Sequence, residues 1–569
     1  MARERQLLRD LAEYKSNFTL QRWSSTAAGE LCLHFELELA ICKFQGTLVY
    51  PHLFPDVPAY ILPQKHGERW SHHQYGGSGV LCLQYGPDNW HPAVTGVDLV
   101  CSADTLLWNE VFTAIVPEFE SVPSRHTATL GRDLRNHSRR FFATPGLRRI
   151  LSNAENASPI VLNIVRRTVA SSSVVVATSA GTPSVPIEDV PITLSSENYE
   201  SKGYAVLVAG VDAFTPNMSV AALKSTLGTA WPWTERLENL RYLVLHDVSG
   251  AIRAYRLSEE AEPNIWPYHL VDFEAPPSQR LPAEFDTLAN VRVAIIGLGS
   301  LGSKIAVSLA RAGVRRFVLV DDDVLAPQNL VRNELNWLDV GFAKVTAVQR
   351  ELKLVAIGAE VTTHISTIAG QENSQLAAEV CEDVAACTLV IDATANSNAF
   401  VVLAALTRHS NISMVWGEVF AGGVGAMMAR SRSNLDADAL SIRSHIYGIL
   451  ATMQPVPKGR SSGYNHEAGS EVYVASDADV SALAASMTQF TLDALCARED
   501  TAYPVAAYLL GYRKYWEFQG PFDTIPIDCT AARRPAEEPE SLTEVEAADL
   551  VELIKAMEGD VSVADNGSQ

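Results

Sequence analysis

The feature that most constrains the fold is a glycine-rich turn between two apolar runs, within residues 291–320. The first run, VRVAII, leads into GLGSLG, and an Ala-rich segment connects this turn to the second run, FVLV. Gly297, Gly299 and Gly302 let the turn close and let backbone N–H groups approach a phosphate at the positive end of a helix. Asp321 follows the glycines at the sequence spacing at which an acidic residue binds a ribose hydroxyl in nucleotide-binding motifs. The stretch therefore predicts a nucleotide-binding strand–turn–helix–strand unit, with a purely structural turn as the alternative.

The polar residues that follow favour ATP over a dinucleotide. Asn329 and Arg332 form an Asn-x-x-Arg pair, Lys344 comes next, and Asp392 ends the apolar run LVID. An arginine and a lysine suit the charge of a triphosphate. A carboxylate at the carboxyl end of a strand suits Mg²⁺ or the attacking group. A hydride-transfer enzyme needs none of these residues after its acidic residue.

Taken in this order, the glycines, the aspartate, the Asn-x-x-Arg pair, the lysine and the later aspartate resemble the ubiquitin-activating superfamily. That superfamily includes ThiF and the adenylating enzymes of molybdopterin and thiamin synthesis. The resemblance covers about residues 290–430. It implies an α/β Rossmann-like adenylation domain, placed at residues 286–535, with ATP and Mg²⁺ as cofactors and Asp392 as the metal ligand. It also implies a homodimer formed through residues 291–430.

The length and composition of the chain limit the number and type of domains that accompany this unit. A chain of 569 residues has room for about three domains, and 47% hydrophobic with 20% charged residues is typical of a globular protein. The net charge of −21 argues against a nucleic-acid-binding surface. The N-terminal segment has the pattern of an amphipathic helix rather than of a signal peptide, and no apolar run is as long as a membrane span. We therefore expect a cytoplasmic protein whose partners include neither a nucleic acid nor a membrane.

The eight cysteines form no CxxC pair, so the structural zinc site of some adenylating relatives is not expected here. A reduced chain is expected, in which some of these thiols react. Cys32, Cys42 and Cys101 have the pattern of core residues, as do Cys381 and Cys387.

The first 145 residues have the order of an α+β domain. We expect a helix at residues 1–20, antiparallel strands at residues 31–50, and helical structure at residues 102–140. Between the strands and the second helix lie a Pro-rich segment, a loop rich in His, Gly and Ser, and the sequence GVLCLQYGPDNWHP.

This order resembles the ubiquitin-conjugating fold, whose thioester cysteine lies in a Gly-x-Ile-Cys-Leu motif. Gly79–Leu83 matches that motif with Cys82, and Trp90 and Pro92 follow at the family's spacing. The resemblance implies that Cys82 is a nucleophile. A buried strand cysteine between two leucines is the alternative.

The chain departs from that family at the His-Pro-Asn place, where it has His72, His73 and Gln74. In the family the asparagine supports the oxyanion when a lysine attacks the thioester. Either Gln74 or His73 is expected to supply the donor here, and the sequence does not choose between them.

The middle of the chain, residues 146–285, is expected to form a small α/β or β-rich linker domain, with no site assigned to it. Its residues 170–191 are rich in Ser, Thr and Pro, which is typical of an exposed connection. Further along, we expect a long polar loop at residues 431–475, a helix from residue 477, and a strand pair at residues 508–520.

The segment DTIPIDCTAARRP resembles the Cys-Thr segment of the autophagy-type activating enzyme. The resemblance implies that Cys529 accepts the acyl group. Arg533 and Arg534 follow it, and a thiolate gains from nearby cations and from partial exposure. Cys496 is the rival, and its helical spacing favours a core position. Residues 536–569 form an acidic tail.

An adenylation domain with one reactive cysteine before it and one behind it makes a complete relay, because a tethered second thiol accepts the acyl group by exchange. The combined order resembles bacterial fusions of conjugating and activating domains from CBASS anti-phage operons. The resemblance implies as partners a substrate protein with a free C-terminus, either ubiquitin-like or a cyclic-nucleotide synthase, and a target amine. The alternatives are a sulfur-carrier adenylating enzyme of cofactor biosynthesis and a non-catalytic adaptor that binds a ubiquitin-like protein.

Overall fold

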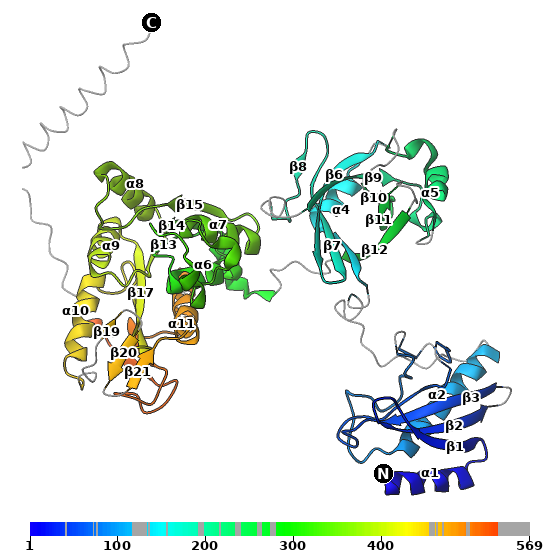
Figure 1. The fold of residues 1–569 in the computed structure, drawn as a ribbon. Coiled ribbons are helices and arrows are strands. Elements are labelled where there is room, and N and C mark those ends of the chain that lie inside the picture. Colours follow the sequence, from blue (N-terminus) through cyan, green and yellow to red (C-terminus); the bar gives the residue numbers. More distant parts are fainter. Residues whose placement is uncertain are drawn as a thin grey trace, which may run out of the picture. The chain divides into compact units, whose positions relative to one another are not determined.

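The computed structural model divides the chain into two compact units, Met1–Asp133 and Leu134–Gln569, and the second unit contains two separate sets of hydrophobic cores. The chain therefore has three parts (Figure 1). The structure describes residues 1–39, 42–65, 67–71, 73–75, 78–115, 134, 137–154, 158–191, 199–215, 218–233, 241–258, 264–272, 280–454, 461–462, 465–468, 471–496 and 501–532.

The first part is an antiparallel sheet packed against helices. Its strands pair in chain order, and alternate residues of the second strand, Leu33, Phe35 and Leu37, are fully buried with Leu8 and Leu99 from the two helices. This packing confirms the expected α+β layout. The elements are α1 (Ala2–Tyr14), β1 (Phe18–Ser25), β2 (Leu31–Leu39), β3 (Cys42–Tyr50), β4 (Tyr60–Pro63) and α2 (Gly96–Ile115).

The second part is a sheet that closes on itself. Its strands run in the order β5-β12-β11-β10-β9-β6-β7-β8, and β5 also pairs with β7. The expectation of a strand-rich part is confirmed. The elements are β5 (Arg139–Ala143), α4 (Pro145–Ser152), β6 (Ile160–Val169), β7 (Ser172–Ala180), β8 (Val185–Pro186), β9 (Tyr199–Leu207), α5 (Val220–Leu227), β10 (Arg241–His246), β11 (Ile252–Ser258) and β12 (Asn264–Asp272).

Several expected boundaries in these two parts are wrong. Helix α1 ends at Tyr14 rather than at residue 20, because Phe18 is buried against Phe35 as part of β1. Residues 139–143 are a strand rather than the end of a helix. They pair with β12, so the second part begins before the expected boundary at residue 145. Strand β7 occupies much of the segment expected to be an exposed connection, because its β-branched residues pair with β6.

The third part is a sheet of order β15-β14-β13-β16-β17-β18-β22-β23, in which the strands from β15 to β17 are parallel and the rest antiparallel. This order is that of an open α/β Rossmann-like sheet. The strands are β13 (Arg292–Ile296), β14 (Arg316–Val320), β15 (Glu360–His364), β16 (Leu389–Asp392), β17 (Ser413–Phe420), β18 (Gly425–Ser431), β22 (Ala507–Gly511) and β23 (Thr524–Ile527), and β19 (Ser461–Ser462), β20 (Asn465–Ala468) and β21 (Glu471–Val474) form a separate small sheet.

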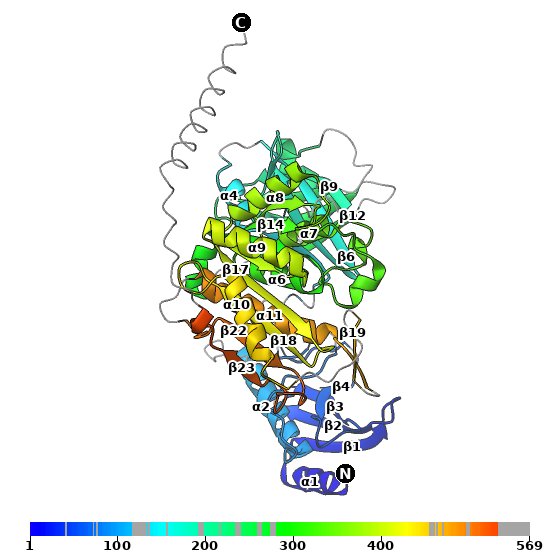
Figure 2. The same cartoon turned by 90° about the vertical axis from the view of Figure 1, so that its left-hand side faces the viewer.

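Helices cover both faces of the large sheet because its central strands are apolar on both sides. Val293 and Ile295 of β13 pack into one core, and Ala294 and Ile296 pack into the other. Helices α6 (Ser300–Ala312), α7 (Lys344–Val355) and α11 (Asp477–Leu495) supply the first core, and α8 (Ser374–Ala385), α9 (Ser397–Ser410) and α10 (Ala439–Leu450) supply the second. The second group lies on the left in Figure 1 and toward the viewer in Figure 2.

Two expectations for this part are corrected. Residues 431–475 are not one polar loop, because Asp438 caps α10 by accepting the Ser441 N–H, and Ile442 and Ile446 of α10 are buried. The strand pair expected at residues 508–520 is instead β22 paired with the later strand β23. The helix expected from residue 477 is confirmed as α11.

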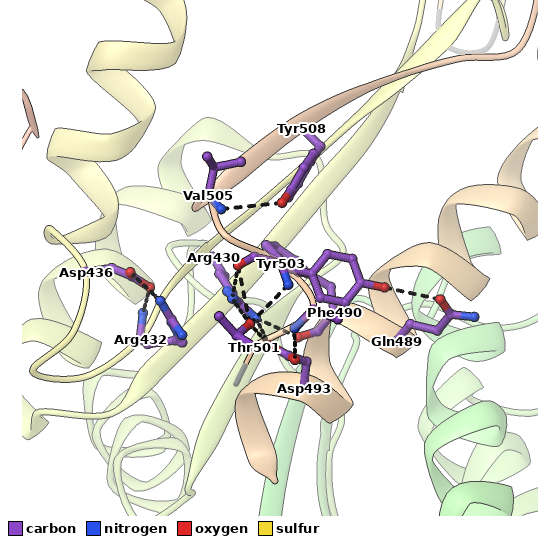
Figure 3. A network of polar contacts seen from close by, with 11 residues as sticks. Arg430, Arg432, Asp436, Gln489, Phe490, Asp493, Thr501, Tyr503, Val505 and Tyr508 are labelled. Atoms are coloured by element: carbon purple, nitrogen blue, oxygen red, sulfur yellow. Dashed lines mark hydrogen bonds and ion pairs between the residues drawn. The ribbon is translucent and has the colours of Figure 1, made fainter. Parts of the chain in front are cut away.

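A buried ion pair fixes α11 to the antiparallel side of the sheet (Figure 3). Arg430 of β18 is fully buried, and its Nη1 lies 2.7 Å from Asp493 Oδ2. Its guanidinium lies 4.2 Å from the ring centre of Phe490 and donates to the carbonyl of Tyr503 at 2.9 Å. Removing either charge would leave the other buried without its partner, which typically destabilises a fold by about 3–5 kcal/mol.

Candidate functional site

A cavity of about 600 Å³ lies at the carboxyl ends of the parallel strands. Its walls come from the segments that follow β13, β14, β15 and β16, and from residues 417–419 of β17. In open α/β sheets this edge is where ligands bind, at the point where the strand order reverses. Here β14 and β15 lie on one side of β13, and the next strand in the chain, β16, lies on its other side, so the strand order reverses at β13.

The three glycines of the first turn have different roles. Gly297 has φ +84°, and a Cβ there would lie 3.1 Å from the backbone of Ala393. A Cβ at Gly302 would overlap the carbonyl oxygen of Gly297, so this glycine allows α6 to pack close to the turn. A Cβ at Gly299 would meet nothing within 4 Å, and Gly299 lines the cavity. The protein itself therefore requires Gly297 and Gly302, whereas Gly299 leaves room for a ligand.

This difference gives a matched pair of variants. We expect Gly302→Ala to lower the free energy of unfolding by about 1–3 kcal/mol, because the overlap forces the turn to move. We expect Gly299→Ala to unfold like the wild type but to bind an ATP analogue more weakly. Denaturant unfolding and calorimetric titration measure the two effects. Equal stability and equal affinity in both variants would contradict these roles.

Asp321 and Lys344 both line the cavity, and their role in binding ATP stays a prediction. Asp321 accepts the Leu298 N–H at 2.6 Å and the Asp323 N–H at 2.9 Å. Lys344 Nζ lies 2.6 Å from Asp323 Oδ2 and 3.7 Å from Asp321 Oδ1. Burial raises the pKa of Asp321, and the two backbone N–H groups and Lys344 act in the opposite sense. The cavity thus holds one carboxylate suited to hydroxyl groups and one ammonium suited to phosphate.

Asp392 lies at the end of β16, 5% exposed. Its Oδ1 accepts the Thr394 N–H at 2.9 Å and the Thr394 hydroxyl at 2.6 Å. Burial raises the pKa of Asp392 and of nearby Glu418. The described part of the chain contains no cluster of three or more His, Cys, Asp or Glu arranged to hold a metal ion. A Mg²⁺ here would therefore take most of its ligands from phosphates and water, as Mg²⁺ commonly does.

Besides Gly302 and Asp392, two more predicted residues do not line the cavity, and Asp392 lines a narrow pocket that adjoins it. Asn329 accepts the Ala326 N–H at 2.9 Å and caps a short 3₁₀ turn. Arg332 donates to the carbonyl of Ala475 at 2.8 Å. Neither residue lines the cavity. Their spacing in the sequence reflects a loop that both residues hold in place, and their role in binding ATP stays a prediction.

Ser366 was not singled out in the sequence. It follows β15, lines the cavity, is 1% exposed, and its hydroxyl has no hydrogen-bond partner among the described residues. A buried hydroxyl in a ligand cavity is a natural partner for a polar atom of the ligand. The only sequence signal for it was its position just after a parallel strand.

Cys529 is buried rather than partly exposed, which corrects the expectation for this thiol. It is 5% exposed at the end of β23, and its Sγ lies 3.6 Å from the carbonyl of Ile527. Burial, together with Asp528 and Asp436, raises the pKa of the Cys529 thiol to about 11. Arg533 and Arg534 lie outside the described residues. A buried thiol with a raised pKa is not an active nucleophile, so the segment that carries Cys529 must move before this thiol can react.

The other cysteines differ in burial. Cys32 and Cys387 are buried as expected, whereas Cys42, Cys101, Cys381 and Cys496 are only partly buried. Cys496, the expected rival of Cys529, follows α11, and burial raises the pKa of its thiol.

Cys82 lies beside the segment that the sequence placed at the His-Pro-Asn position. The Cys82 N–H donates to the His73 carbonyl at 2.7 Å, and Gln74 forms a bridge with Leu81. Cys82 is half-buried. Burial raises the pKa of its thiol, and a hydrogen bond with the Tyr75 side chain acts in the opposite sense. His72 lies outside the described residues.

The Gln74 side chain is held by hydrogen bonds to the backbone around it rather than being available as a donor for Cys82. Its Nε2 donates to the carbonyls of Glu68 and Gly79 at 3.0 and 2.8 Å, and its Oε1 accepts the Trp70 N–H at 2.9 Å. Both amide hydrogens are therefore in use. Tyr75, which is 41% exposed, is the residue whose side chain contacts Cys82, and the sequence analysis missed it.

The segment of the chain that forms the cavity matches a known protein family. Residues 279–498 match the ThiF family. This segment of the chain is a ThiF family domain. It contains the glycine turn, Asp321, Lys344, Asp392 and most of the large sheet.

Short stretches of the chain are similar to named relatives. The chain is 36% identical over 88 residues to the ATP-dependent ubiquitin transferase-like protein Cap2 of Pseudomonas aeruginosa, covering 15% of this chain and 16% of the relative. It is 33% identical over 84 residues to the NEDD8-activating enzyme E1 catalytic subunit of Caenorhabditis elegans, covering 15% and 20%. It is 29% identical over 197 residues to the uncharacterized protein y4oA of Sinorhizobium fredii, covering 32% of each. The chain thus matches at most about a third of the length of these relatives.

Among solved structures, the chain is similar to E. coli MccB with ATP, at 16% identity and a TM-score of 0.33, over 44% of this chain and 67% of that one. It is also similar to PaaA, at 16% identity and a TM-score of 0.33, over 43% and 75%. Within the described ranges, no helix is both long and apolar enough to cross a bilayer.

Proposed function

We propose that this chain uses ATP to adenylate the C-terminal carboxylate of a protein and then conjugates that protein to an amine. The observation that carries the proposal is the cavity of the ThiF family domain, which an open glycine turn, Asp321 and Lys344 line at one edge of the sheet. Buried Asp392 lines a narrow pocket that adjoins this cavity. The names of two relatives, a ubiquitin transferase-like protein and an activating enzyme subunit, support the same class of chemistry.

In the first step a carboxylate oxygen of the substrate attacks the α-phosphorus of ATP. A phosphorus–oxygen bond forms, the bond to the bridging oxygen breaks, and pyrophosphate leaves with its electron pair. Lys344 stabilises the charge on the phosphates. Asp392 would hold a Mg²⁺ ion, which would supply charge stabilisation when bound. The glycine turn gives the phosphates backbone N–H partners.

In the second step the Cys529 thiolate attacks the acyl carbon, and AMP leaves. Thiol exchange then moves the acyl group to Cys82, with Cys529 leaving as thiolate, and an amine finally displaces Cys82 to form an amide. Because Cys529 is buried, this step requires its segment to open first. A substrate of the ubiquitin-like or cyclic-nucleotide synthase kind, and a role in CBASS anti-phage defence in the cytoplasm, belong to this proposal.

Pyrophosphate exchange tests the first step. We expect the chain, supplied with Mg²⁺, ATP and a ubiquitin-like protein or cyclic-nucleotide synthase encoded beside it, to incorporate labelled pyrophosphate into ATP. Exchange that needs the free C-terminus of that protein supports adenylation. Binding of the protein without any exchange would favour the adaptor alternative, and transfer of sulfur to the adenylated C-terminus would favour the sulfur-carrier alternative.

Tyr75 provides a test of the conjugating step. We expect Tyr75→Phe to load Cys82 normally but to slow its discharge to an amine by roughly 10²–10³-fold, because it removes a hydroxyl donor beside the reacting sulfur. His73→Ala tests the remaining candidate from the sequence. Gln74→Ala is expected to loosen the whole segment, with loading and discharge both reduced. Timed discharge of the isolated thioester distinguishes these outcomes, and an unchanged rate in Tyr75→Phe would exclude its hydroxyl.

A homodimer through the ThiF family domain also belongs to the proposal. Between β14 and α7, five large apolar side chains are more than half exposed: Val324, Val331, Trp337, Leu338 and Phe342. Several exposed large apolar side chains in one segment are typical of a surface that another protein covers. We expect light scattering to give twice the chain mass of 61.9 kDa, and Trp337→Glu to reduce it to the single mass. A wild-type chain at the single mass at micromolar concentration would contradict the dimer.

A further inference from the structure

The second part of the chain has a cavity of its own, at one end of the closed sheet. Its volume is about 480 Å³, which is in the range of small-molecule sites, and the mouth of a closed sheet is a common place for such a site. The walls are the end of β9, the turn between β10 and β11, and helix α4 with the residues that follow it. The cavity shares no residue with the nucleotide cavity, so the proposed function makes no use of it.

His246, the last residue of β10, is buried in the wall of this cavity. It is 3% exposed and lies on the same face of β10 as Tyr242 and Val244, which pack with α4 into the core of this part. Burial lowers the pKa of the His246 ring, although the neighbouring Asp247 acts in the opposite sense, so the ring is neutral at pH 7. It forms no hydrogen bond with any residue that the structure describes.

An imidazole without a partner in this position is unfavourable for the fold. Taking a polar ring out of water without a hydrogen bond lowers stability, and an apolar side chain would fill the same space at no such cost. Buried polar side chains normally have a partner within the protein or in an ordered molecule beside them. A ligand in the cavity can supply the partner that the chain does not.

The two arginines in the wall already have partners. Two nitrogens of Arg148 donate to Asp272, and its Nη1 donates to the Gly250 carbonyl at 2.6 Å. Arg149 lies at the exposed rim, where its Nη1 is 2.7 Å from Glu188 Oε2. Neither guanidinium therefore needs an anion from outside the chain.

The carboxylate in the wall is occupied as well. Asp247 accepts the N–H groups of Val211, Ser249 and Ala251, and it also accepts the Ser249 hydroxyl. A charged ligand would thus enter the cavity without a free counter-charge, which is costly away from water. Much of the remaining wall is apolar: Leu151, Ala154, Leu207, Val248 and Ile252.

We infer that this cavity binds a small uncharged organic molecule whose apolar body carries a hydroxyl or carboxamide group that pairs with His246. A neutral imidazole can present either a donor or an acceptor to the cavity, depending on its tautomer. A hydroxyl and a carboxamide can each take the complementary role. The apolar wall covers the body of the ligand, and the paired charges disfavour anions and cations alike.

The test uses four fluorinated benzene derivatives of about ten non-hydrogen atoms: para-fluorobenzamide, para-fluorobenzyl alcohol, para-fluorobenzoate and para-fluorobenzylammonium. Fluorine NMR measures their binding to the full-length chain. We expect the amide and the alcohol to bind with dissociation constants of about 1–10 mM, as is typical of ligands of this size. The benzoate and the benzylammonium ion are expected to bind at least about 10-fold more weakly, because neither finds a free counter-charge.

The variants locate the binding. His246→Phe keeps a flat ring but removes both nitrogens, so it should weaken binding of the amide and the alcohol by about 3–10-fold. It is also expected to unfold at or above the wild-type temperature, since it removes an unpartnered polar group. Leu207→Trp keeps His246 but fills the cavity from the adjacent strand, and it should abolish binding. His409→Phe, the same change at an exposed position of α9, is the matched control and keeps wild-type binding.

Each contrary outcome overturns a stated part of the inference. Wild-type affinity for the amide in a folded His246→Phe chain would exclude His246, and wild-type affinity in Leu207→Trp would exclude the cavity. Tighter binding of the benzoate or the benzylammonium ion than of the amide would contradict an uncharged ligand. A wild type that binds none of the four molecules overturns the whole inference, and none of these results bears on adenylation. If His246→Phe does not fold, Leu207→Trp and the preference for uncharged molecules decide.

Discussion

Replacing Asp392 by asparagine is expected to reduce pyrophosphate exchange by at least about 10²–10³-fold. Asparagine keeps the size of the side chain and can still accept from Thr394 N–H and the Thr394 hydroxyl, so the turn after β16 should stay in place. What is lost is a buried carboxylate in the narrow pocket that adjoins the cavity. The change therefore affects the reaction more than the fold.

The experiment compares exchange rates at saturating ATP with thermal unfolding of the same samples. Asp286→Asn, an exposed carboxylate before β13, is the matched control and is expected to retain full exchange. Asp392→Asn that unfolds like the wild type and exchanges at the wild-type rate would show that Asp392 is not part of the reaction.

The second large effect concerns the two thiols. Cys529→Ala is expected to keep pyrophosphate exchange but to lose every thiol-sensitive adduct, including the one on Cys82. Cys82→Ala is expected to keep the adduct on Cys529 and to lose all thiol-resistant conjugate. The loss should be complete in both variants, because each removes the only atom that carries the acyl group at its step.

The pH dependence follows from the raised pKa of Cys529. With a pKa of about 11 in the closed state, only about one thiol in 10⁴ is ionised at pH 7. Alkylation of Cys529 by iodoacetamide, and its loading without a substrate-induced opening, should therefore rise steadily as the pH increases toward 11. Loading that is already fast and independent of pH at neutral pH would show that the segment opens before the reaction.

Cys496→Ala is the control for the relay and is expected to load both thiols normally. An adduct on Cys82 that forms at the wild-type rate in Cys529→Ala would mean that Cys82 takes the acyl group directly from the adenylate. Full conjugate in Cys82→Ala would make Cys82 structural and remove the conjugating step.

The sequence by itself determined the adenylation core, because its signals are local. Gly302 is required by a contact within one strand–turn–helix unit, and Gly297 by the positive φ of the turn. Asp321 and Lys344 lie next to that unit in the fold. The alternation of β2 likewise predicted the α+β layout of the first part. Patterns of this kind can be read from neighbouring residues, since period and turn chemistry decide them.

Only the tertiary structure decided the rest. Arg443 of α10 lies against Phe400 of α9, whose ring packs on Trp416 of β17, and no sequence spacing encodes these contacts. Gln74 had the right position to serve Cys82, but three backbone groups hold its amide elsewhere. Burial of a thiol or an indole is a sum over all the segments packed around it, so the sequence alone does not determine it.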